Sequence, residues 1–245
     1  MKSAAPKRAR VVSPQRDQDI KDRIVTAAEH VFAQMGTEKA TLRDITARAR
    51  VNVAAVSYYF GSKSDLVHSV FDKLSTRLNE QRIRDLEECQ EHARKVSTPP
   101  DLRSILEIFI RPYLDGKSGR LFARMILQHR LAPSEITQTI ISAHFDPMAR
   151  RFIQAISDAC PQLDARVFFW RYVFMIGSVV YTVADTGVLD RTAYLSGGRV
   201  RARNAADIAD AMLDFLVAGV ASQPGVLGES PLMGIAGNPR KRRPR

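Results

Sequence analysis

Helix start and stop signals crowd into residues 41–63 and leave little freedom in local structure. Thr41, with Asp44 three residues later, fits a capping box, which marks a helix N-terminus. Asn52 is a preferred N-cap residue for a second helix, and Gly61 fits the left-handed position that ends it. The segment therefore predicts two short helices joined by a tight turn.

The second of these helices has a face made of small side chains. Ala54, Ala55 and Ser57 are small enough for the helix to approach another molecule closely, while Val56 and Phe60 lie four residues apart and would anchor it to a core. An α-helix fits the major groove of B-DNA. The pattern therefore favours a DNA-binding helix. A further capping box then predicts the start of the next helix at Ser62 and Asp65.

The same stretch resembles the TetR-type regulators, whose N-terminal domain is three helices with a helix-turn-helix formed by the second and third. The resemblance covers residues 18–78 and implies a homodimer that binds double-stranded DNA. The residues that carry it are Thr41-Leu42-Arg43-Asp44-Ile45, Ala49, Val51-Asn52 and Tyr58-Tyr59-Phe60-Gly61-Ser62-Lys63, with Ile20, Ile24, Ala28, Phe32 and Gly36 in the first helix.

The turn departs from the family pattern, which usually has glycine where this chain has Arg50. A non-glycine residue at positive φ costs on the order of 1 kcal/mol. We expect the turn to tolerate this strain or to shift slightly.

The resemblance assigns the DNA contacts residue by residue. Arg43 would reach a base edge or a phosphate, because arginine bidentate to guanine is the commonest specific contact. Lys63 would pair with phosphate. Of the two neighbouring tyrosines, Tyr59 is expected on DNA, and one of the pair would pack in the core. The predicted DNA-binding residues are Thr41, Arg43, Val53, Ala54, Ala55, Ser57, Tyr58, Tyr59 and Lys63.

The charge is concentrated at the two ends of the chain, which carries a net +11 over 245 residues. A basic tail is expected at 1–17, a DNA-binding domain at 18–78 with its helix-turn-helix at 41–60, a ligand-binding and dimerisation domain at 79–221, and a second basic tail at 222–245. Both tails are expected to be disordered. The N-terminal tail is expected to attract DNA phosphates, whereas the C-terminal tail is as consistent with a solvated end.

The rest of the chain reads as helices, so the fold class is all-α with about nine of them. Loops are expected at 115–119 and at 188–203, and Pro112 and Pro147 are expected to kink or divide their helices. The helix predicted over 164–186 is apolar around more than one face, which requires burial on most sides. Burial within the monomer would satisfy this. The resemblance instead implies that this helix and the last one form a four-helix bundle with a second copy.

The second domain is expected to be a ligand sensor. Arg171 lies in an apolar helix, and a buried arginine needs an anionic partner. That partner could be a ligand carboxylate or a carboxylate of the chain such as Asp185 or Glu135. The residues predicted to line the ligand cavity are Phe109, Tyr113, Phe122, Met125, Ile126, His129, Phe145, Met148, Phe152, Trp170, Arg171 and Phe174.

The order of elements from Pro99 to Val183 is weakly similar to the TetR branch that responds to fatty acids or acyl-thioesters. This similarity favours a hydrophobic, acidic small molecule as the effector. The predicted function is a repressor released from a palindromic operator by that effector. Two alternatives remain open: a DNA-binding protein of low sequence specificity without ligand control, and a ligand-dependent activator.

Enzyme, cofactor and membrane functions have no support in the sequence. Gly116-Lys117-Ser118 resembles the end of a phosphate-binding loop, but Arg111 stands where that loop needs glycine. The five histidines lack metal-ligand spacing, so neither a metal nor a cofactor is expected. Two cysteines without a CxxC motif, and no signal peptide, predict a cytoplasmic protein.

Overall fold

The computed structural model describes residues 14–184, 187–200 and 205–223. Every regular element in these residues is a helix, which confirms the predicted all-α class. The ten helices are α1 (Pro14–Met35), α2 (Leu42–Ala49), α3 (Val53–Phe60), α4 (Lys63–Lys95), α5 (Leu102–Leu114), α6 (Gly116–Leu131), α7 (Glu135–Ala159), α8 (Ala165–Val183), α9 (Val188–Leu195) and α10 (Ala205–Ala221).

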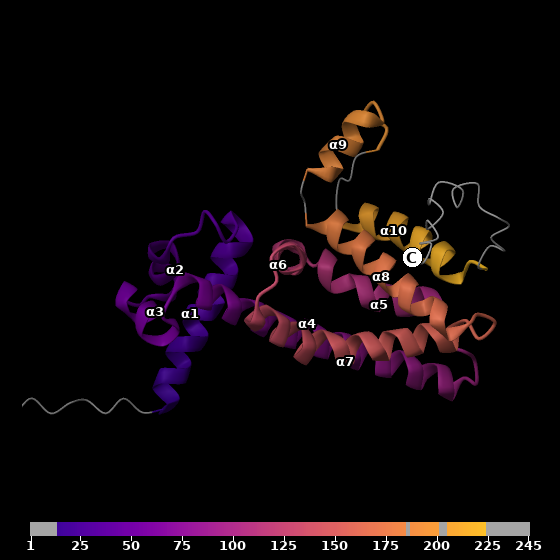
Figure 1. Cartoon of the computed structure of the whole chain (residues 1–245), viewed down its shortest axis with the longest axis horizontal. Coiled ribbons are helices and arrows are strands. Elements are labelled where there is room, and N and C mark those ends of the chain that lie inside the picture. The colour runs from indigo at the N-terminus through magenta and orange to yellow at the C-terminus, as the bar shows by residue number, and fades with distance from the viewer. Residues whose placement is uncertain (1–13, 185–186, 201–204, 224–245) are drawn as a thin grey trace, which may run out of the picture.

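Two groups of helices are joined by the long helix α4. Figure 1 shows α1, α2 and α3 gathered at one end, with α4 running from them into a larger group built from α5 to α8 and α10. Helix α7 lies alongside α4, and α9 projects away from the body. Apolar residues buried in both groups belong to one continuous core. The two halves of the molecule therefore share a packed interior.

The predicted caps are present. Thr41 Oγ1 accepts a hydrogen bond from the Asp44 backbone N–H at 3.2 Å, and the Asp44 carboxylate accepts one from the Thr41 backbone N–H at 2.9 Å. Asn52 Oδ1 accepts from the Ala54 N–H at 3.0 Å. Ser62 caps α4 by accepting from the Asp65 N–H at 3.1 Å. These local bonds fix where α2, α3 and α4 begin.

Two predicted loops proved to be helical. Helix α6 begins at Gly116, inside the expected loop at 115–119, and α9 occupies part of the expected loop at 188–203. Gly119 explains the first case, because a Cβ there would lie 2.5 Å from the Tyr113 carbonyl oxygen. The glycine lets the first turn of α6 pack directly against the end of α5.

Neither of the two prolines divides its helix, which was one of the two expected outcomes. Pro112 and Pro147 lie inside α5 and α7, and both helices continue past them. A proline inside a helix removes one backbone hydrogen bond and crowds the preceding turn. In each helix the carbonyl three residues before the proline accepts a side-chain bond from α4. Arg82 Nε donates to the Phe109 oxygen at 3.1 Å, and Asn79 Nδ2 donates to the His144 oxygen at 3.1 Å.

The first helix starts at Pro14, so the last residues of the predicted 1–17 tail belong to α1. Residues 1–13 of that tail, and all of the 222–245 tail beyond residue 223, lie outside the described residues. Their predicted disorder and their predicted DNA contacts stay predictions.

Replacing Gly119 by alanine should lower the free energy of unfolding by about 1–3 kcal/mol or more, because the new methyl group overlaps backbone oxygens that cannot move independently. Arg120→Ala, at the next and exposed position of α6, is the matched control and should change stability by no more than about 0.5 kcal/mol. Chemical denaturation measures both. Equal stability of the two variants would show that α6 does not pack as described.

Candidate functional site

The turn between α2 and α3 is held by an arginine from another helix. Arg50 adopts the left-handed conformation with φ 54° and ψ 49°, so the glycine position is filled by a strained residue. Arg23 of α1 donates from Nη2 to the Ala49 carbonyl and, at 3.1 Å, to the Arg50 carbonyl. A guanidinium at these carbonyls complements the negative end of α2. Sequence reasoning missed Arg23, because nothing local to the turn indicates it.

Helix α3 presents an exposed face of four residues. Val53, Ala54, Ser57 and Tyr58 are exposed, whereas Val56 is fully buried against the core. Ala55 is half-buried and packs on that core, and its expected contact with bases stays a prediction. The four exposed residues form a surface of small side chains from which Tyr58 protrudes.

The two tyrosines of α3 differ in exposure, and the DNA contact expected of Tyr59 stays a prediction. The Tyr58 side chain is 78% exposed. Tyr59 is half-buried, and its hydroxyl donates to Asp17 Oδ1 at 2.6 Å. This hydrogen bond to a carboxylate raises the pKa of Tyr59 to about 12. Tyr59 therefore ties α3 to the start of α1, and Tyr58 is the more exposed of the two.

The remaining predicted contacts surround this face. Thr41 and Arg43 are exposed at the start of α2. Hydrogen bonds from the Thr41 hydroxyl and backbone hold the pKa of Asp44 below its usual value, so this cap weakens only when the pH falls into the range where Asp44 is protonated. Lys63 is half-buried, and its Nζ donates to the Glu38 carbonyl at 3.2 Å. Arg43 is thus free to reach outward, while Lys63 has a partner within the chain.

Most of the predicted ligand residues form a packed aromatic interior. They lie on α5, α6 and α7, and ring pairs such as Tyr113–Phe122 at 5.5 Å and Phe109–Phe152 at 5.3 Å link neighbouring helices. The buried members are Phe109, Tyr113, Phe122, Met125, Ile126, His129, Phe145, Met148 and Phe152. The structure therefore brings these nine together.

Three predicted ligand residues lie elsewhere. Trp170 and Phe174 are 67% and 64% exposed and stack on each other along the outer face of α8, so neither lines an interior cavity of the chain. Arg171 donates from its guanidinium to the carbonyls of Val220 and Ser222 at the end of α10. These carbonyls lie at a helix C-terminus, which attracts cations. Asp185, one of the carboxylates expected to pair with Arg171, lies outside the described residues.

The buried arginine of this domain is instead Arg82 on α4. Its side chain is completely buried and lies 4.3 Å from the ring centre of Tyr113. Sequence reasoning missed it because α4 is strongly polar in its second half, and an arginine there looks like a solvated residue. The aromatic residues that surround it come from α5 and α6, which are distant in sequence.

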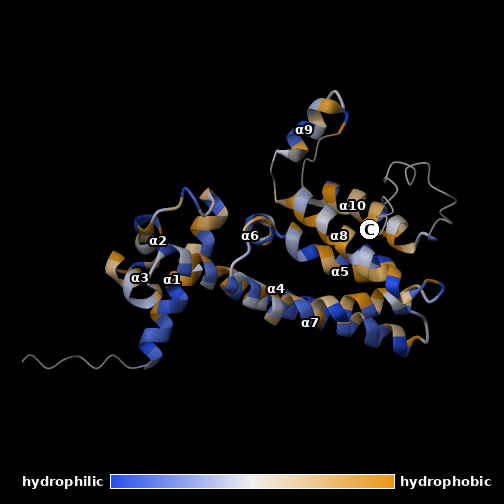
Figure 2. Ribbon diagram, viewed as in Figure 1, coloured by the Kyte–Doolittle hydropathy of each residue, from blue (hydrophilic) through white to orange (hydrophobic). Residues whose placement is uncertain are grey.

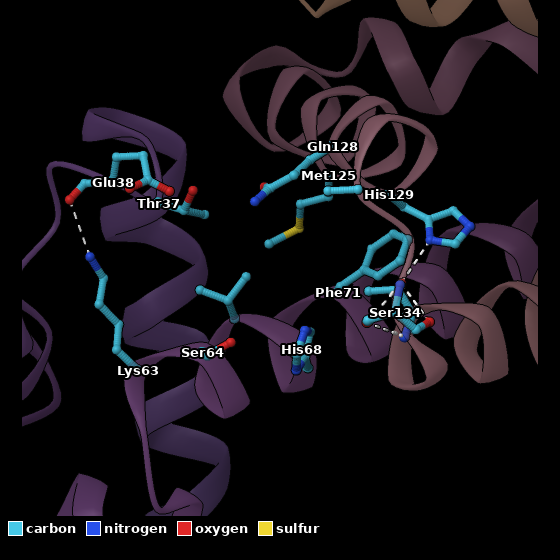
Figure 3. Close-up of a pocket in the computed structure, with 13 residues that line it drawn as sticks. Thr37, Glu38, Lys63, Ser64, His68, Phe71, Met125, Gln128, His129 and Ser134 are labelled. Carbon is cyan, nitrogen blue, oxygen red and sulfur yellow. Dashed lines mark hydrogen bonds between the residues drawn. The ribbon is translucent and has the colours of Figure 1, made fainter.

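A cavity of about 410 Å³ lies where the two groups of helices meet. Figure 3 shows its lining, with Lys63 reaching toward Glu38 on one side and Phe71, Met125 and His129 on the other. His129 is buried, its Nδ1 lies 2.7 Å from Thr137 Oγ1, and burial lowers its pKa. A histidine whose pKa falls below its ordinary value is neutral at neutral pH. The cavity thus has an apolar inner wall and a polar rim.

The described part of the chain has neither a metal-binding cluster nor a membrane-spanning helix. No group of three or more histidine, cysteine, aspartate or glutamate side chains is placed to hold a metal ion. None of the helices between Pro14 and residue 223 has both the length and the hydropathy needed to cross a membrane.

The fold, together with the exposed face of α3 beside α2, defines a helix-turn-helix DNA-binding protein with a second, helical domain. Residues 24–70 match the family of bacterial regulatory proteins called tetR, and residues 107–219 match the tetracyclin repressor-like C-terminal domain. The chain belongs to the TetR family and is a transcriptional regulator, not an enzyme.

Relatives and solved structures agree with this assignment. The transcriptional dual regulator CecR of Shigella flexneri is 25% identical over 183 residues, which are 71% of this chain and 80% of that protein. The transcriptional repressor Rv3405c of Mycobacterium tuberculosis is 44% identical over 55 residues, 22% of this chain and 29% of that protein. The fatty acid degradation regulator FadR from Bacillus halodurans has the same fold, with a TM-score of 0.54, 15% identity, and coverage of 81% of this chain and 98% of that one.

The separate roles of Tyr58 and Tyr59 can be tested by substituting each residue. Tyr58→Ala should weaken binding to an operator about tenfold and lower the melting temperature only slightly, because the side chain is 78% exposed and its ring contact is the edge-on packing against Tyr59 at 4.8 Å. Tyr59→Phe should lower the melting temperature while the folded protein still binds DNA, because only the bond to Asp17 is lost. Fluorescence anisotropy and thermal denaturation measure the two effects. Loss of DNA binding in Tyr59→Phe alone would restore the sequence prediction.

Proposed function

We propose that this regulator is a homodimeric, cytoplasmic repressor that leaves a palindromic operator when a hydrophobic, acidic small molecule binds its second domain. The observation that carries the proposal is the exposed face of α3, backed by Val56 in the core and flanked by Arg43. A short helix with small exposed residues and an anchored back can lie in a major groove. Arg43 then supplies a base-edge or phosphate contact.

Dimerisation is supported by an apolar surface on the last two long helices. Figure 2 shows hydrophobic residues along α8 and α10, which lie apart from the DNA-binding group formed by α1, α2 and α3. The exposed ones are Phe169, Trp170, Val173, Phe174 and Tyr181 on α8 and Phe215 on α10. Monomeric soluble proteins rarely leave a large apolar patch uncovered. A second copy that covers this face would place two α3 helices for successive major grooves, about 34–36 Å apart.

Ligand control is supported by the aromatic interior and by the cavity that joins the two groups of helices. Pockets with apolar walls and a few polar groups are the usual form of small-molecule sites. A FadR from Bacillus subtilis with the same fold was solved in complex with stearoyl-CoA, at a TM-score of 0.50 and 17% identity. That protein's ligand makes fatty acids and acyl-thioesters reasonable first candidates here.

The activator alternative has one observation in its favour. CecR, the relative that spans most of this chain, is described as a dual regulator. Whether a bound dimer blocks or assists transcription depends on where the operator lies relative to the promoter. The geometry of α2 and α3 is the same for both outcomes.

The dimer surface can be tested by charge. Phe174→Glu should convert the dimer to monomers, because it places a carboxylate in the centre of the apolar face. Leu131→Glu is the matched control, since Leu131 is a 79% exposed leucine on α6 that lies away from this face. Analytical ultracentrifugation measures the mass of each variant. A Phe174→Glu protein that remains dimeric would contradict the proposed interface.

Ligand control can be tested by gel shift with the DNA upstream of the protein's own gene. We expect a discrete shift that one class among acyl-CoAs, free fatty acids and aromatic acids abolishes. Random DNA of equal length is the control, because non-specific binding follows phosphate charge and not sequence. Equal binding to both DNAs, insensitive to every compound, would favour a DNA-binding protein of low specificity without ligand control.

A further inference from the structure

The Arg82 guanidinium is an unneutralised positive charge in the centre of the second domain. Its side chain has 0% exposed area. Nε donates to the Phe109 carbonyl at 3.1 Å, and Nη1 donates to Asn79 Oδ1 at 2.7 Å. Nη2 is buried and has no hydrogen-bond partner. One edge of the guanidinium is therefore without an acceptor.

The surroundings of Arg82 do not supply an anion. The guanidinium faces aromatic rings instead. Its carbon lies 4.3 Å from the ring centre of Tyr113, 5.3 Å from that of Phe109 and 5.8 Å from that of Phe122. No carboxylate among the described residues forms an ion pair with it. Burial raises the pKa of the neighbouring Tyr172, so that side chain stays a neutral phenol. Cation–π contacts offset part of the lost hydration, but they leave the charge in place.

Buried ion pairs in proteins normally satisfy both partners, and a guanidinium matches a carboxylate in a two-bond fork. The Arg82 guanidinium is the donor of such a pair, and it lies among aromatic side chains with Nη2 still without an acceptor. We propose that Arg82 binds the carboxylate of an apolar organic acid, whose hydrophobic body packs among the surrounding aromatic rings. This assignment rests on the proposed ligand-controlled function and names the chemistry of its effector.

A route to Arg82 begins at the cavity between the two groups of helices. Phe71 and Met125 form part of the cavity wall. The Phe71 ring lies 6.5 Å from the Phe122 ring, which in turn lies against Arg82. Phe145 packs against both of these rings, at 6.1 Å from Phe71 and 5.7 Å from Phe122. Rotation of Phe71 and Phe122 would let the acid extend from the cavity to Arg82.

The same rings lie on helices that support the DNA-binding group. Phe71 is on α4 and Phe122 is on α6, and both helices contact α1. Glu29 of α1 accepts from Arg77 of α4 at 2.9 Å and from Ser118 of α6 at 3.3 Å. A ligand that separates α4 from α6 would thus change the support of α1. Such a ligand binds one arrangement better than the other, which is the requirement for allosteric control.

The alternative is that Arg82 only supports the fold, by satisfying the carbonyl three residues before Pro112. Calorimetry on the full-length protein separates the two roles, with decanoate and 4-phenylbutyrate as probes and their primary amides as uncharged analogues. We expect at least one acid to bind and its amide to bind at least about tenfold more weakly, since bonds to charged groups are the stronger ones. Arg82→Met should bind the acid and the amide equally.

Arg171→Gln is the matched control, because the Arg171 guanidinium donates to helix-end carbonyls, lies 5.9 Å from the Phe168 ring centre and makes no contact with Arg82, so acid binding should be unchanged. Arg82→Lys serves if Arg82→Met does not fold. It keeps the charge but loses the fork, and should weaken acid binding about tenfold while the amide is unaffected. Equal binding of acid and amide by the wild type, or full acid binding by either Arg82 variant, would overturn the proposal.

The result for the acid and the result for the operator are distinguishable. If acyl-CoAs release DNA but neither acid binds, the ligand-controlled function stands and the carboxylate site falls. If an acid binds through Arg82 but DNA is not released, the site stands and the proposed control of transcription falls.

Discussion

The side chains of Arg82 and Asn79 on α4 are the contacts on which the second domain depends. They bond to each other, and each reaches a carbonyl on a different neighbouring helix, Phe109 on α5 and His144 on α7. Both carbonyls lie in helical turns that a proline disturbs. Breaking one partner of a buried polar network leaves the other unsatisfied, which costs about 1–3 kcal/mol or more. Helix α4 therefore sets the spacing of its neighbours.

The same helix connects this network to the DNA-binding group. Its first turns pack Leu66 and Val70 into the core beneath α1, and Lys73 donates to Thr26 of α1 at 2.8 Å. The Arg77–Glu29 pair adds a modest amount, because Arg77 is half exposed and water screens the interaction. Packing, more than ion pairing, makes α1 and α4 move together. On the proposed ligand control, a change around Arg82 would reach α2 and α3 through the contacts of α4 with α1.

Local signals in the sequence were enough for the helix-turn-helix. The caps at Thr41, Asn52 and Ser62 depend on residues three or fewer positions apart, so sequence spacing predicts them directly. The left-handed Arg50 was likewise identified as strained. Two of the misses depend on contacts between distant segments: Arg23 at the turn and the Tyr59–Asp17 bond. The start of α6 depends on the close approach of Gly119 to the end of α5, and α9 projects from the body of the molecule. The burial of Arg82 also depends on residues distant in sequence, because the rings around it come from α5 and α6. The apolar pattern of α8 did not reveal which of its faces stays exposed.

The most direct test of this account is the distance between the two DNA-binding groups of a dimer. Spin labels at Ala47→Cys, with Cys89 and Cys160 replaced by serine, would report that distance by pulsed electron resonance, because Ala47 is exposed on α2. We predict that an acid bound in the second domain shifts the distance in the labelled parent and leaves it unchanged in Arg82→Met. An unchanged distance in the parent, under conditions where the acid releases DNA, would contradict coupling through α4.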